Sequence, residues 1–304
     1  MKVYIFADQE GCACIFSRQE GYVHAEEYAT IELVAVCNAL LEHGVEQILL
    51  NTIHTVEYHK FPAQVRILHG LERHDIYTCG MEGGFDAAIV VGMHAMAGGR
   101  ERGCWRHTLL PHPISRAYSA IEEVRLNDRL VGEFELFAAF AGLHRVPVIM
   151  ESGDYWAGLE AADFIPGIEV VEVKHGTSYE SAISLTPQAA ADAAADGAVH
   201  ALRLIGQIPP VRIDGQVTIQ VRYLFPERAT DAMMAVADCR RIDERTVAVT
   251  YPDLRAFREH HGCIRAPELP VYAQDVDMPR ATGLFTRLGG EPYESTPTYP
   301  PPSR

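Results

Sequence analysis

Basic residues are scarce in this sequence. Lys and Arg together number 26 against 41 Asp and Glu, which gives a formal net charge of −15 at pH 7. Surfaces that bind nucleic acid or anionic lipid depend on clustered Lys and Arg side chains that contact phosphate. The charge balance therefore argues against a nucleic-acid partner and against a membrane-surface partner.

Long apolar runs are also lacking. No uninterrupted hydrophobic stretch reaches the roughly 18 residues of a membrane-spanning helix, and Asp8 ends the first apolar stretch too early for a signal-peptide core. The seven cysteines are an odd number and are scattered without the spacing of a disulfide framework. We therefore expect a cytoplasmic protein without structural disulfides.

Several common catalytic and binding motifs are missing as well. The sequence contains no Gly-x-Ser-x-Gly turn, no Walker loop and no Gly-x-Gly-x-x-Gly fingerprint. Cys12-Ala13-Cys14 has no second cysteine pair at the spacing of a zinc knuckle. These absences argue against the usual serine-hydrolase, nucleotide-binding and thiolate-zinc interpretations.

The first half of the chain contains short apolar runs that alternate with helical and irregular stretches. Strands are predicted at residues 3–6, 47–51, 87–92 and 146–150, and a helix at residues 28–43. A hairpin at residues 121–131 is predicted around Asn127-Asp128. Because the runs are continuous rather than alternating, both faces of their sheet should be covered, as in a mostly parallel sheet. The predicted fold class is α/β, with a three-layer α/β/α domain.

The second half has a different pattern. An Ala-rich helix is predicted from Thr186-Pro187 to about residue 206, and a half-buried strand at residues 215–223 is followed by helix, strand and helix. Eight of the 18 prolines fall in the last 38 residues. The predicted organisation is an α/β/α metal-binding catalytic domain at residues 1–165, a smaller α+β domain at residues 166–265 and a Pro-rich tail at residues 266–304.

Acidic and histidine side chains follow the predicted strands. Asp8 and Glu10 come after the first strand and point to the same side of an extended chain. His54 follows the second strand, His94 the third, and Glu133 the hairpin. Alone, each of these residues is more often a helix cap, a solvated turn residue or packing. Together, at the edge where doubly wound sheets bind ligands, they form a credible set of metal ligands.

Two metal ions suit this set better than one. A carboxylate can bridge two ions about 3.5–4 Å apart, the spacing of hydrolytic two-metal sites, and Asp8 is the candidate bridge. Imidazole and carboxylate without thiolate favour zinc, with manganese and cobalt as the alternatives. His107 lies in the long irregular stretch after His94 and could act as a general acid or base; the competing interpretation is a surface-loop histidine.

Four segments carry a resemblance to a known family. They are residues 3–11 (VYIFADQEG), 92–95 (GMHA), 103–107 (GCWRH) and 126–133 (LNDRLVGE). In this combination the sequence resembles the zinc-dependent D-aminopeptidases of peptidase family M55, also described as DppA-like dipeptide transport proteins. The likeness extends in order over residues 1–265.

The resemblance implies a specific arrangement of the centre. Asp8 would bridge two zinc ions per subunit, with Glu10 and His94 completing one and His54 and Glu133 the other. His107 would be the catalytic histidine. The family fold is an α/β/α domain with a smaller α+β domain, assembled into a ring-like homo-oligomer, a decamer, whose active sites face an internal chamber.

The predicted activity is hydrolysis of short peptides with an N-terminal D-residue of the D-Ala type. Water activated by two zinc ions would attack the first peptide carbonyl, assisted by His107. One alternative is a dinuclear amidohydrolase that acts on another small amide. The other is a non-catalytic peptide-binding or transport accessory protein.

Overall fold

The computed structural model covers the whole chain of 304 residues. It describes residues 1–16, 23–69, 75–99, 102–108, 121–236 and 238–260. The Pro-rich tail predicted at residues 266–304 lies outside these ranges. No helix in the described part is long and apolar enough to cross a membrane.

A seven-stranded sheet forms the centre of the larger layered unit. Its members are β1 (Lys2–Ala7), β2 (Gln47–Thr52), β3 (Val65–Leu68), β4 (Ala87–Met93), β7 (Val148–Asp154), β8 (Glu169–Ser178) and β9 (Ser181–Ser184). Their order is β3-β2-β1-β4-β7-β8-β9, and all neighbours are parallel except β8 and β9. The chain winds outwards in both directions from the adjacent strands β1 and β4. The crevice at their carboxyl ends is therefore the expected ligand site.

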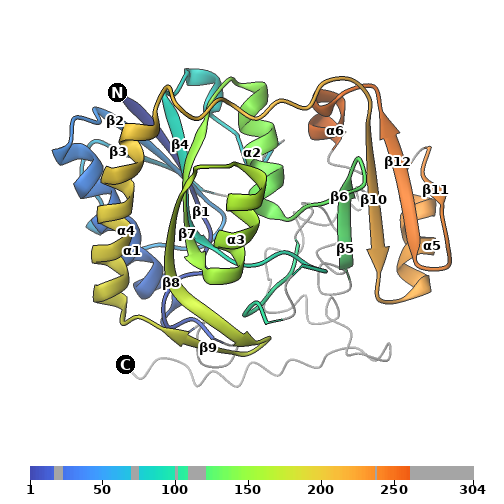
Figure 1. Cartoon of the computed structure of the whole chain (residues 1–304), viewed down its shortest axis with the longest axis horizontal. Coiled ribbons are helices and arrows are strands. Elements are labelled where there is room, and N and C mark those ends of the chain that lie inside the picture. Colours follow the sequence, from blue (N-terminus) through green and yellow to red (C-terminus); the bar gives the residue numbers. More distant parts are fainter. Residues whose placement is uncertain (17–22, 70–74, 100–101, 109–120, 237, 261–304) are drawn as a thin grey trace.

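Helices cover both faces of this sheet. Helices α1 (Ala25–Glu42) and α4 (Pro187–Ala201) pack together on one face, and α2 (Glu133–Leu143) and α3 (Tyr155–Phe164) lie on the other (Figure 1). As a result, every residue of β4 and β7 is buried. The predicted three-layer α/β/α architecture with a mostly parallel sheet is confirmed.

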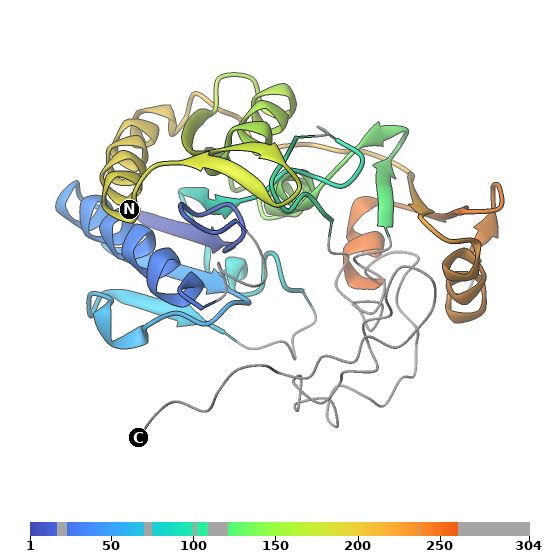
Figure 2. The same ribbon diagram turned by 90° about the horizontal axis from the view of Figure 1, so that it is seen from below.

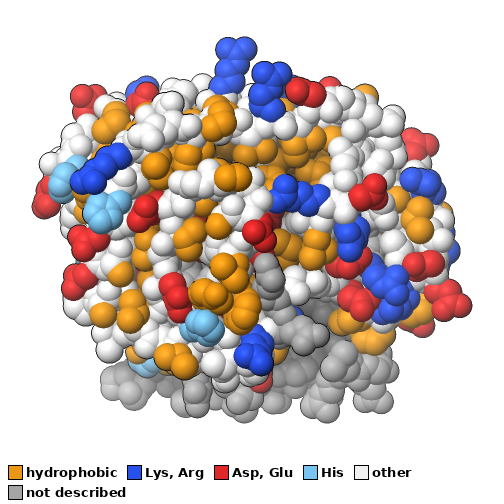
Figure 3. Space-filling model, in the orientation of Figure 1, with side chains coloured by type: hydrophobic (Ala, Val, Ile, Leu, Met, Phe, Trp, Pro, Cys, Tyr) orange, Lys and Arg blue, Asp and Glu red, His pale blue; other side chains and the backbone are white. Residues whose placement is uncertain are grey.

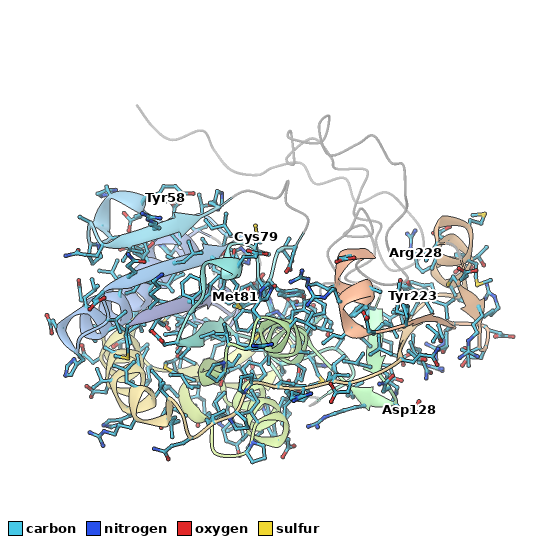
Figure 4. All side chains as sticks on the ribbon, turned by 90° about the horizontal axis from the view of Figure 1, so that it is seen from above. Tyr58, Cys79, Met81, Asp128, Tyr223 and Arg228 are labelled. Atoms are coloured by element: carbon cyan, nitrogen blue, oxygen red, sulfur yellow. The ribbon has the colours of Figure 1, made fainter. Side chains whose placement is uncertain are left out.

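A second, antiparallel sheet lies beside the first. Its order is β11-β12-β10-β5-β6, formed by β5 (Ile121–Leu126), β6 (Arg129–Leu130), β10 (Val217–Tyr223), β11 (Arg240–Arg241) and β12 (Thr246–Tyr251). Helices α5 (Pro226–Ala235) and α6 (Leu254–His260) pack on it (Figure 2). Asn127 and Asp128 both have positive φ, as a tight hairpin turn requires, and Asp128 is exposed (Figure 4).

The strands of the two sheets do not separate at residue 165, the predicted boundary between the domains. Strands β8 and β9 and helix α4, expected in the smaller domain, extend the first sheet and cover one of its faces. Hairpin β5–β6, expected in the larger domain, pairs with β10 of the second sheet. The chain therefore crosses between the sheets before β5, before α2 and after α4. The predicted boundary cuts the chain into consecutive segments, so it could not show that elements on each side of residue 165 join the other sheet.

A groove lies where hairpin β5–β6, the end of α3 and the segment before β10 meet. It is lined mainly by hydrophobic side chains, among them Leu126, Phe164, Pro166 and Val211, and a hydrophobic hollow is visible there in Figure 3. None of the six candidate site residues lines it. The candidate centre is therefore a separate place in the fold.

Candidate metal centre

The tips of β1 and β4 approach each other through glycine. A Cβ atom on Gly92 would lie 2.4 Å from the Asp8 carbonyl oxygen, and one on Gly11 would lie 2.0 Å from that of Met93. The Gly11 N–H donates to the Gly92 carbonyl at 2.7 Å. Only glycine permits backbones to come this close. The contact brings the segment carrying Asp8 and Glu10 next to His94.

Asp8, Glu10 and His54 form the first group of candidate ligands. The His54 Nε2 atom lies 3.1 Å from Asp8 Oδ1 and 3.2 Å from Glu10 Oε2. His54 follows β2, and its backbone N–H donates to the Thr52 hydroxyl at 3.0 Å. Parallel pairing aligns Ala7 with Thr52, so the two strand ends deliver their polar side chains to one place.

His94, His107 and Glu133 form the second group. The His94 Nε2 atom is 3.3 Å from Glu133 Oε1 and 3.3 Å from Asp8 Oδ2. The His107 ring stacks on the His94 ring with centroids 3.8 Å apart, and its Nε2 is 3.7 Å from Glu133 Oε1. Glu133 is the first residue of α2. Asp8 contacts both groups, one through each carboxylate oxygen.

All six predicted site residues therefore lie together. Glu10 lies against His54, and Glu133 lies against His94. The assignment of ligands to individual ions, Glu10 and His94 to one and His54 and Glu133 to the other, stays a prediction. Asp8 lies between the two groups, as a bridging carboxylate must.

A short backbone ladder brings His107 to the centre. Its N–H donates to the Ala95 carbonyl at 3.2 Å, and its own carbonyl accepts from the Ala97 N–H at 3.1 Å. The Thr108 hydroxyl also accepts from Ala97 N–H, at 3.0 Å. His107 thus lies alongside the segment that follows His94. This pairing has no signature in the sequence, because the intervening loop has no regular pattern.

Burial makes the charges of the centre interdependent. Asp8, Glu10, His94 and Glu133 are buried, whereas His54 and His107 are the more exposed members. Burial alone would lower the pKa of His54, but the carboxylates of Glu10 and Asp8 outweigh it and raise the pKa to about 10. Asp8 and Glu133 likewise raise the pKa of His94 against the effect of burial. The clustered carboxylates thus demand positive charge, from protons or from bound cations.

Backbone carbonyls fix which ring nitrogen of two histidines faces the centre. The Nδ1 atom of His94 lies 2.9 Å from the Ala95 carbonyl oxygen, and that of His107 lies 2.6 Å from the Trp105 carbonyl oxygen. Each Nδ1 must donate a proton there, so Nε2 of the neutral ring carries a lone pair. Burial, together with the neighbouring His94, lowers the pKa of His107.

The donor set fits zinc. Among the described residues, Asp8 Oδ2 and His94 Nε2 are buried without a hydrogen-bond partner, although they face each other. Such atoms are costly to bury unless a cation or proton lies between them. Oxygen and imidazole nitrogen are ordinary zinc ligands. The Cys12 thiol contacts the Asp8 backbone carbonyl instead, at 3.8 Å, so it packs beside the centre.

Two buried charged residues near the centre were not predicted. The Lys174 ammonium donates to backbone carbonyls of the segment after β1, and Glu32 Oε1 accepts from the Ala13 N–H at 2.7 Å. The available signals were a lysine directly after the valines of β8 and a glutamate within the apolar part of α1. A charged residue in a buried stretch of sequence is retained where a specific partner satisfies it.

Comparison with known proteins gives consistent results. The model of the family Peptidase_M55, described as D-aminopeptidase, matches residues 1–260. A D-aminopeptidase of Bacillus subtilis is 24% identical over 233 residues, which is 73% of this chain and 81% of the relative. A solved structure, described as the Zn-dependent D-aminopeptidase DppA from Bacillus subtilis, a self-compartmentalizing protease, superposes with a TM-score of 0.78 at 21% identity, covering 85% of this chain and 94% of that one. Because the family match extends through both sheets, the chain belongs to the D-aminopeptidase family M55.

Proposed function

We propose that this chain is a zinc-dependent aminopeptidase that removes an N-terminal D-residue, of the D-Ala type, from short peptides. The observation that carries the proposal is the convergence of three carboxylates and three imidazoles in one buried cluster. Membership of the D-aminopeptidase family supports the substrate class, and the likeness to the Zn-dependent Bacillus subtilis structure supports zinc.

Two zinc ions per subunit are proposed, held by Asp8, Glu10, His54, His94 and Glu133. Bound there, the ions would supply an activated water and polarise the peptide carbonyl. The arrangement of Asp8 supports its role as the bridge, because Oδ1 faces His54 and Oδ2 faces His94. Three carboxylates carry three negative charges at most. Two divalent ions therefore leave a small positive excess that suits an oxyanion.

His107 is proposed as the group that holds and moves the proton. Its Nδ1 is committed to the Trp105 carbonyl, so its Nε2 lone pair is directed to the side of Glu133. A proton taken up at Nε2 would then be available to the leaving amine. The partial exposure of His107 and His54 supports access of a substrate from their side. Two zinc ions with nearby carboxylates would also receive the free amine of an unblocked peptide.

Hydrolysis of three matched substrates tests the function. D-Ala-D-Ala, L-Ala-L-Ala and N-acetyl-D-Ala-D-Ala are incubated with zinc-loaded protein, and the amino acid released is quantified. We expect turnover of the first at least about a hundredfold faster than that of the other two. Preference for the acetylated peptide would instead identify an amidohydrolase. Binding of D-Ala-D-Ala without hydrolysis would identify an accessory binding protein.

We also propose assembly into a ring-like homo-oligomer, a decamer, in the cytoplasm. The description of the Bacillus subtilis relative as self-compartmentalizing supports a closed assembly. Light scattering coupled to gel filtration measures the mass directly. A monomer at micromolar concentration would contradict the assembly while leaving the proposed chemistry untouched.

A further inference from the structure

A lysine is buried inside the first sheet next to the candidate centre. Lys174 of β8 is 1% exposed, and its Nζ donates to the carbonyl oxygen of Ile15 at 2.7 Å and to that of Glu10 at a shorter distance. Burying an ammonium group is expensive, so its hydrogen bonds must be specific. The two acceptors lie at opposite ends of the turn that follows β1. One ammonium group therefore ties both ends of this turn together.

The later part of the turn is held by hydrogen bonds from its own backbone N–H groups. The Gly11 N–H is bonded to the tip of β4, the Ala13 N–H to Glu32, and the Cys14 N–H to the Ser184 hydroxyl at 2.8 Å. These bonds hold the residues after Glu10. The Glu10 backbone carbonyl accepts from the Lys174 ammonium, while the Glu10 carboxylate lies 3.2 Å from His54 Nε2. Lys174 therefore holds the backbone of a residue whose side chain reaches the centre.

We propose that Lys174 is a positioning residue that fixes Glu10 as a metal ligand, an inference that rests on the proposed metal centre. Lys174 acts through the Glu10 backbone, to whose carbonyl it donates, and Glu133, at the start of α2, serves as the comparison ligand. Positioning groups behind metal ligands affect metal affinity by about 10- to 100-fold. Loss of the ammonium donor should therefore weaken zinc binding through Glu10 alone.

A double-mutant cycle on zinc affinity tests the inference. Apoprotein is titrated with zinc against a chromophoric chelator for Lys174→Met, Glu10→Gln, Glu133→Gln and the two double variants. We expect Lys174→Met to weaken zinc binding by about tenfold or more in the wild-type and Glu133→Gln backgrounds. In the Glu10→Gln background it should change the affinity less than about threefold, because the ligand it positions is already lost.

The control is Lys60→Met, which makes the same substitution at a surface lysine whose ammonium pairs with Glu57. It should leave zinc affinity unchanged. An equal loss in all three backgrounds for Lys174→Met would mean a general structural role and would overturn the inference, as would no loss in the wild-type background. If Lys174→Met fails to fold by circular dichroism, Lys174→Gln, which keeps an amide donor, is carried through the same cycle.

The cycle also separates this inference from the proposed function. Wild-type protein that binds no zinc would contradict the metal centre itself. Wild-type protein that binds zinc, with Lys174 variants that bind it equally well, would contradict only the role of Lys174.

Discussion

His107 differs from the other histidines of the centre in its surroundings. Its ring stacks on the His94 ring, and its Nε2 lies 3.7 Å from Glu133 Oε1. Of the three histidines at the centre, it is the one for which the family resemblance does not imply a role as a zinc ligand. We expect His107→Ala to retain zinc and to lose about 10²- to 10⁴-fold in kcat, the usual contribution of a proton-transfer group. Elemental analysis and D-Ala-D-Ala hydrolysis measure the two effects. His59→Ala, in an exposed 3-10 helix, is the control, and near-normal turnover of His107→Ala would remove its catalytic role.

Asp8 is the residue on which both halves of the centre depend. Its carboxylate contacts His54 through one oxygen and His94 through the other, so an amide in its place removes the charge that both halves share. We expect Asp8→Asn to lower the zinc content and to abolish measurable hydrolysis. The exposed Asp86→Asn is the matched control and should keep full zinc content. Full zinc content in Asp8→Asn would contradict the bridging role.

At the scale of elements, the close contact of β1 and β4 depends on Gly92. Its φ of +81° is unfavourable for other residues, and an added Cβ would collide with Asp8 backbone atoms. We expect Gly92→Ala to lower the free energy of unfolding by about 3 kcal/mol or more. Gly44 is the control, because its φ is +90° but nothing lies within 4 Å of an added Cβ. Gly44→Ala therefore measures the cost of positive φ alone and should lower the free energy of unfolding by about 1–2 kcal/mol. Urea unfolding measures both, and equal costs would contradict the collision.

The elements that the sequence predicted are those with strong local patterns. Strands β1, β2, β4 and β7 are continuous buried runs, and hairpin β5–β6 has a turn sequence that permits positive φ. Strand β3 has only four residues, none fully buried, so its pattern is weak. Helix α3 starts directly after β7, with the Asp154 carboxylate accepting from the Trp156 N–H at 2.9 Å. No loop separates these two elements, and the strand predicted at residues 146–150 therefore stopped short of the end of β7 at Asp154.

The candidate ligands after strands were predictable because parallel pairing brings strand ends to one edge. Asp8, Glu10, His54 and His94 follow from this rule. Glu133 and His107 do not, because Glu133 starts α2 after a hairpin of the other sheet and His107 is held by a loop ladder. They were candidates because Glu133 follows the hairpin and His107 lies in a long irregular stretch, but their places at the centre depend on tertiary contacts that no local pattern records.

At the scale of the whole molecule, the two sheets are interwoven along the chain. We expect a fragment that ends at residue 165 to lack a cooperative thermal transition, because it loses β8, β9 and α4 from the first sheet. Hairpin β5–β6 would also lose its pairing with β10. Circular dichroism and thermal melting of the fragment, beside the full chain, measure this. A sharp transition with native helix content would support an independent domain at residues 1–165.

The wide separation of the five proposed metal ligands along the chain has a consequence for synthesis. Asp8 and Glu10 leave the ribosome early, Glu133 follows only after most of the first sheet, and Lys174 later still. At about 5–20 residues per second, this delay lasts several seconds or more. On the proposed ligand set, the centre is complete only once Glu133 has been made, and the contact with Lys174 can form only once β8 has been made. We therefore expect zinc to be taken up late in the maturation of the chain.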